Sequence, residues 1–123
     1  SQQAAAALGR KCLQLILRDK ADIKPSNLSK EIDDVANNKT MPPSLIESIV
    51  EIKNLGNFKI YPSKSLSTGE VVDATPEEAE WVLDVLESLF DFYFVQPAKI
   101  MAKREALNKK LSDLAGDNAT NGC

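Results

Sequence analysis

The stretch TPEEAEWVLDVLESLFDFYFVQP, residues 75–97, decides the fold class. Thr75 is a typical helix N-cap, Pro76 suits the first helical position, and Glu78, three residues after the cap, completes a capping box. Apolar residues then recur at three- and four-residue spacing: Ala79, Val82, Leu83, Leu86, Leu89, Phe90, Tyr93 and Phe94. The stretch therefore predicts a long central helix, which Pro97 ends or kinks.

Three shorter amphipathic helices are predicted before this stretch. The first covers about residues 3–20, and its apolar face is formed by Ala4, Ala7, Leu8, Cys12, Leu15 and Ile16, flanked by Leu13 and Leu17. The second is capped by Ser26 or Asn27 and ends near Asn38. The third starts at Pro42 and Pro43, and Gly56 is expected to stop it. After Pro97, helical spacing of apolar residues continues to Gly116.

Residues 57–74 show no helical period and contain several Ser, Gly and Pro residues, so we expect a long, mobile, irregular loop. Two short strand candidates, 58–61 and 70–72, could pair only with each other. We therefore predict an all-α fold, an antiparallel bundle of four to five helices with one long irregular loop. It forms a single domain over residues 1–116, followed by a disordered tail over residues 117–123.

The composition excludes several function classes. The 123 residues include no histidine, so Ser-His and Cys-His catalysis and zinc sites with His ligands are excluded for this chain alone. Glu47 and Glu51 lie one helical turn apart, but no further ligand converges on them, so we expect no metal site and no cofactor. A net charge of −3 and the lack of long apolar runs argue against a membrane partner and favour a cytoplasmic protein.

Charge is segregated along the chain. From Glu70 to Asp91 every charged residue is acidic, whereas Lys99, Lys103, Arg104, Lys109 and Lys110 make the next segment basic. Two solvated helix faces are the default interpretation, and the alternative is that the two surfaces meet across an interface. Because the helix of residues 76–96 is apolar on nearly all sides, we expect part of it to be buried in a homodimer.

The segments EIKNLGNFKIYP, residues 51–62, and GEVVDATPEEAEWVLDVLESLFDFYFVQPA, residues 69–98, resemble a bacterial family catalogued as domain of unknown function 4145, a branch of the HEPN superfamily. The segments AAAALGRKCLQLILRDK, LSKEIDDV and KREALNKKL are also similar to it, so the resemblance covers nearly the whole chain. It implies a HEPN-like helical bundle that pairs into dimers. Relatives often carry an upstream cysteine-rich segment, so the resemblance also leaves open a zinc ribbon before Ser1.

Many HEPN domains are similar to metal-independent ribonucleases that use an Arg and a His. At the matching positions this chain has Lys53 and Tyr61, while Gly56 and Asn57 follow the family pattern. Tyrosine titrates near pH 10 and lysine lacks the bidentate geometry of arginine, so we expect no catalytic residue. The candidate residues of a loop or cleft remain Lys53, Gly56, Asn57 and Tyr61. Gly56 is expected to serve the helix stop, and Asn57 is at least equally interpretable as a residue whose side chain ties down the loop after the third helix.

Two functional hypotheses follow. The first is a non-catalytic HEPN-like domain that self-associates and binds a protein or RNA partner, with a defence or toxin–antitoxin setting implied by the superfamily alone. The second is a degenerate metal-independent ribonuclease or RNA-binding domain whose cleft is lined by Lys53, Asn57 and Tyr61. The missing His and Arg count against the second hypothesis.

Overall fold

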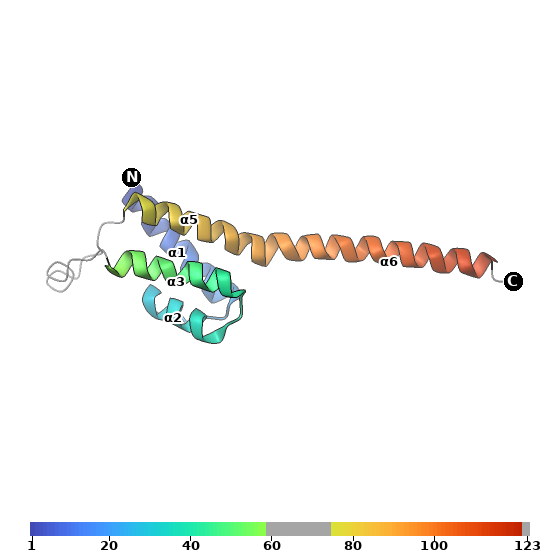
Figure 1. Cartoon of the computed structure of the whole chain (residues 1–123), viewed down its shortest axis with the longest axis horizontal. Coiled ribbons are helices and arrows are strands. Elements are labelled where there is room, and N and C mark those ends of the chain that lie inside the picture. Colours follow the sequence, from blue (N-terminus) through green and yellow to red (C-terminus); the bar gives the residue numbers. More distant parts are fainter. Residues whose placement is uncertain (59–74, 122–123) are drawn as a thin grey trace. The chain divides into compact units, whose positions relative to one another are not determined.

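The computed structural model describes residues 1–58 and 75–121. Figure 1 shows their helices: α1 (Gln2–Lys20), α2 (Leu28–Asn38), α3 (Pro43–Phe58), α5 (Pro76–Phe90), a π-helix (Asp91–Val95) and α6 (Gln96–Asn121). No strand occurs in this part of the chain, so the all-α prediction is confirmed. Most of the predicted loop, and all of both strand candidates except Phe58, lie outside the described residues.

The chain divides into two compact units, Ser1–Leu89 and Phe90–Cys123, and each is described by itself. A single domain over residues 1–116 with a disordered tail over 117–123 stays a prediction. In the second unit the helix does not end at Gly116 as expected, because α6 extends to Asn121.

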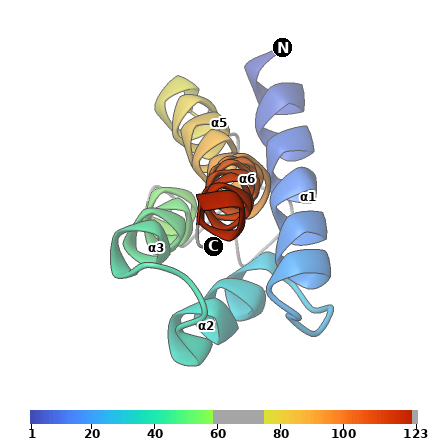
Figure 2. The same ribbon diagram turned by 90° about the vertical axis from the view of Figure 1, so that its right-hand side faces the viewer.

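The first unit is a four-helix bundle. Helix α2 packs against both α1 and α3. Helix α5 meets α1 where Gly9 faces Val82, and it meets α3 where the indole Nε1 of Trp81 donates to the carbonyl oxygen of Ser48 at 2.9 Å. Figure 2 shows the four helices arranged around a shared centre. The side chains with the largest fully buried volumes are Leu13, Leu17, Ile32, Ile49, Ile52, Leu89, Glu31, Val35, Val82 and Val85.

The predicted helix starts are confirmed by their caps. The side chain of Asn27 accepts a hydrogen bond from the backbone N–H of Lys30 at 2.9 Å, which fixes the start of α2. Thr75 does the same for the backbone N–H of Glu78 at 3.2 Å, at the start of α5. The carboxylate of Glu78 contacts Arg10 in α1, so only the Thr75 half of the predicted capping box is seen within the described residues.

The predicted end of the third helix is wrong. Gly56 does not stop the third helix, because α3 continues to Phe58. For Pro97 the sequence left two alternatives: an end of the helix is excluded, since Pro97 lies within α6, and a kink stays a prediction. In the π-helix that directly precedes α6, the backbone N–H of Gln96 donates a hydrogen bond to the carbonyl oxygen of Asp91, five residues earlier. This widened turn accommodates the ring of the following proline, which would clash with a carbonyl group in a regular α-helix.

The predicted apolar face of α1 is also partly wrong. The structure buries the flanking Leu13 and Leu17 together with Ala6, whereas Leu8 and Leu15 from the centre of the predicted face are exposed. Gly9 explains why a different face of α1 is buried. Because this position has no side chain, α5 approaches α1 closely there, and the face of α1 that contains Gly9 points into the bundle. Leu83, which belongs to the apolar pattern of the helix of residues 76–96, is exposed on α5.

Candidate functional site

The structure describes only part of the predicted cleft. Lys53 and Gly56 lie in the last turns of α3, both half-buried. Asn57 also belongs to α3 rather than to a loop, and only its backbone is among the described parts of the chain. Tyr61 lies outside the described residues, so its position beside Lys53 stays a prediction.

Lys53 is already engaged by a carboxylate. Its Nζ lies 2.7 Å from Oδ1 of Asp33, so an ion pair joins α3 to α2. The Lys53 side chain is about one-third exposed and that of Asp33 about one-half, at 29% and 51%. An ion pair this exposed contributes little to stability. The Asp33 carboxylate nevertheless offsets the positive charge of Lys53, which a phosphate-binding cleft would need.

A buried acid lies next to Gly56. Glu78 accepts hydrogen bonds from Nε of Arg10 at 2.9 Å and from its Nη2, and thereby links α5 to α1. A Cβ atom added at Gly56 would be 3.6 Å from Oε1 of the same carboxylate, which is ordinary van der Waals contact. Gly56 therefore lies beside the Arg10–Glu78 pair, and its contact there is structural.

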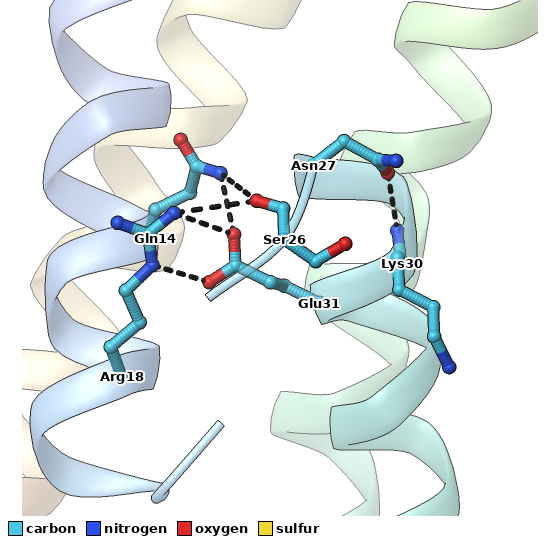
Figure 3. Close-up of polar contacts among 6 residues, drawn as sticks. All are labelled: Gln14, Arg18, Ser26, Asn27, Lys30 and Glu31. Carbon is cyan, nitrogen blue, oxygen red and sulfur yellow. Dashed lines mark hydrogen bonds and ion pairs between the residues drawn. The ribbon is translucent and has the colours of Figure 1, made fainter. Parts of the chain in front are cut away.

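A second buried acid holds α1 and α2 together, as Figure 3 shows. The fully buried carboxylate of Glu31 accepts from Nε of Arg18 at 2.8 Å, from Nη2 of Arg18 at 3.1 Å and from Nε2 of Gln14 at 2.5 Å. Gln14 and Arg18 also donate to the carbonyl oxygen of Ser26, which closes the network. The hydrogen bond that Arg18 donates to Glu31 raises the pKa of Arg18, so this guanidinium stays charged.

Sequence reasoning missed both networks. Glu78 was interpreted as a cap residue and Glu31 was not singled out, although each lies beside apolar residues of a buried helix face. Each acid accepts hydrogen bonds from an arginine of α1, an arrangement that fixes α1 against α2 and α5. Among the residues that the structure describes, no group of three or more acidic or thiol side chains could hold a metal ion.

The second unit presents a different kind of surface. Every described side chain of α6, from Gln96 to Asp117, is exposed. The exposed apolar ones include Ile100, Leu107, Leu111 and Leu114, which recur at intervals of seven, four and three residues and so share one face of the helix. We call these four residues the α6 stripe.

Basic residues border the α6 stripe. Lys103 and Lys110 follow Ile100 and Leu107 by three residues, which places both lysines along one edge of the stripe. Arg104 lies within the stripe itself. Helix α5 carries the opposite charge, because Glu80 and Glu87 lie on its exposed side next to Leu83. Glu80 and Glu87 of the predicted acidic segment and the basic residues of α6 are therefore on exposed helix faces, whereas Glu78 of the acidic segment is buried.

A comparison with protein-family models decides the family. The model of Domain of unknown function (DUF4145) matches residues 1–115. The chain belongs to the DUF4145 family. The match covers the described helices of the first unit and the α6 stripe, so in this DUF4145 chain the exposed helix is part of the family domain.

No curated protein and no solved structure matches the chain. The family match identifies no activity, because the family is defined as a domain of unknown function. In the described part of this DUF4145 chain no helix is long and apolar enough to cross a membrane.

Proposed function

We propose that this DUF4145 chain is a non-catalytic, HEPN-like helical domain that acts by self-association and by binding a partner. A cytoplasmic location and a defence or toxin–antitoxin setting are parts of this proposal that rest on the sequence and on the resemblance to the HEPN superfamily. The bacterial origin rests on the same resemblance.

The exposure of α6 is the observation that carries the proposal. None of the described side chains from Gln96 to Asp117 is buried, although four large apolar residues line one face. A helix in water gains most of its stability from packing such a face against another surface. The α6 stripe is thus an interaction surface, and an interaction surface on a small helical domain supports a role in assembly.

The surroundings of Lys53 support the non-catalytic part. Its ammonium is paired with Asp33, and the chain has no histidine to serve as a base near neutral pH. The second hypothesis, a degenerate ribonuclease, requires Lys53 to contact phosphate in competition with the Asp33 carboxylate. The geometry of the described residues therefore favours binding over catalysis.

The molar mass in solution tests self-association. Light scattering after size-exclusion chromatography at micromolar concentration should give a mass above the 13.5 kDa of one chain. Replacing two stripe residues, Leu107→Asn and Leu111→Asn, should return the protein to the monomer mass, because the substitutions remove the apolar face that packs.

Glu105→Gln and Lys109→Gln provide the matched control. Both positions are exposed on α6 and lie away from the stripe, so this double variant should keep the mass of the parent. A parent protein that has the monomer mass throughout the micromolar range would overturn the proposed self-association.

A further inference from the structure

We propose that the α6 stripe of one chain docks on the acidic, exposed face of α5 in a second copy, with the two helices parallel. The inference rests on the proposed self-association and names its two surfaces. It follows from the order in which apolar and charged residues alternate on each helix.

Helix α6 carries its positive charges on one particular edge. Ile100, Leu107 and Leu114 are spaced by seven residues and are 58%, 55% and 58% exposed. In heptad notation they occupy position d, and Lys103 and Lys110 then occupy position g. The α6 stripe therefore has a basic g edge.

Helix α5 carries its negative charges on the complementary edge. Pro76, Leu83 and Phe90 are exposed and spaced by seven residues, which makes them position a of a heptad. Glu80 and Glu87 each follow one of them by four residues and so occupy position e. The exposed face of α5 is a short apolar row with an acidic e edge.

Parallel helix pairs bring the g edge of one helix against the e edge of the other, whereas antiparallel pairs bring g against g and e against e. In the parallel arrangement Lys103 meets Glu80 and Lys110 meets Glu87, because both pairs of charges are seven residues apart. Leu111 then lies beside Leu83. Among the described residues none of these four charged side chains forms an ion pair, so all of them are available.

Pairing of α6 with a second α6 is the competing arrangement, and its charges oppose it. An antiparallel pair would place the Lys103–Lys110 edge against itself, and a parallel pair would place Arg104 against Arg104 inside the seam. A parallel pairing of α5 with α6 within one chain would need a connection that returns along the length of α5, and only residues 91–95 join the two helices. The occupant is therefore α5 of a second copy.

Charge reversal tests the pairing. Lys103→Glu with Lys110→Glu makes both edges acidic, and Glu80→Lys with Glu87→Lys makes both basic. Each double variant should weaken association at least about tenfold, measured by sedimentation across a micromolar concentration series, because like charges then face each other. Lys109→Glu with Lys24→Glu, which changes the net charge as much as the first variant does but away from the stripe, should associate like the parent.

Mixing restores the complementarity. The two double variants combined in equal amounts should recover association, and so should one chain that carries all four reversals. A variant that merely fails to fold would not recover in either experiment, and circular dichroism of each variant alone should give the helix content of the parent.

The outcomes separate this inference from the proposed function. If the parent associates but the double variants keep its affinity, or if the mixture stays monomeric, the pairing of α6 with α5 is wrong and self-association through another surface stands. If the parent itself is a monomer, both proposals fail.

Discussion

The hydroxyl of Tyr93 is the one buried side-chain polar atom without a hydrogen-bond partner among the residues that the structure describes. The ring of Phe92 meets the ring of Tyr93 edge-on, with 4.9 Å between the centroids. Burial raises the pKa of Tyr93 above the ordinary value of 10.0, because the phenolate would lose its hydration. An unpaired buried hydroxyl also costs free energy in the folded state.

We expect Tyr93 to make the protein less stable as the solution becomes alkaline. Below the ordinary pKa the phenol keeps its proton in both the folded and the unfolded chain, so its contribution is constant. Above it the unfolded chain loses the proton first. The free energy of unfolding should therefore fall as the pH rises from the ordinary pKa to the raised one, and Tyr93→Phe should remove this part of the fall.

The absorbance of the phenolate gives a direct reading. The chain has two tyrosines, so Tyr61→Phe leaves Tyr93 as the only one that titrates. The folded Tyr61→Phe variant should titrate at a higher pH than the same variant in denaturant. Equal midpoints in the two solvents would contradict the burial of this hydroxyl.

At the scale of single elements, the sequence predicts where helices start far better than which faces they bury. The caps Asn27 and Thr75 are confirmed because a cap is a local arrangement of one side chain and the N–H three residues later. The face of α1 was misjudged because Gly9 has no side chain to count in an apolar pattern, although it determines how closely α5 approaches. Packing of this kind depends on a partner helix far away in the sequence.

The contact between α1 and α5 leads to a prediction for Gly9→Ala. The added Cβ would lie 2.7 Å from Cγ1 of Val82, a side chain with no exposed surface. Overpacking costs about 1–3 kcal/mol, and alanine regains only about 0.5–1 kcal/mol of helix propensity. We expect the free energy of unfolding, from urea denaturation, to fall by roughly 1–2 kcal/mol.

Gly116→Ala serves as the comparison, because nothing lies within 4 Å of a Cβ added there. This substitution in α6 should leave stability unchanged or raise it by up to about 1 kcal/mol through helix propensity. Should Gly9→Ala prove as stable as Gly116→Ala, the two helices would not meet at Gly9.

At the scale of the whole molecule, a net charge of −3 conceals two helices of opposite charge. The sequence predicts this segregation because charge can be counted along a chain. The structure places Glu80 and Glu87 and the basic residues of α6 on exposed helix faces. The sequence could not show that Lys53 is paired with Asp33, since twenty residues and a helix boundary separate them. The buried Glu31 and Glu78 were missed for the same reason: their arginine partners come from another helix.

The pairing of Lys53 bears on the behaviour of the whole protein toward RNA. A ribonuclease of the HEPN type needs a base or acid with a pKa near neutrality and a rigid cation beside the scissile phosphate, and proton transfer alone contributes about 10² to 10⁴ in rate. The chain has no histidine, and Lys53, which only the resemblance matches to the position of that cation, is paired with Asp33. We expect no cleavage of labelled RNA by an excess of purified protein, with EDTA present to silence contaminating metal nucleases.

Two variants make that negative result informative. Lys53→Arg combined with Tyr61→His restores the residue types of the ribonuclease pair, and it is the smallest change that we expect to have a chance of producing cleavage. Asp33→Ala alone frees the ammonium of Lys53 and should at most strengthen RNA binding, because it supplies a cation and no base. Cleavage by the parent that follows the protein through purification and disappears in Tyr61→Phe would instead make the protein an enzyme, with the phenol of Tyr61 as its proton-transfer group.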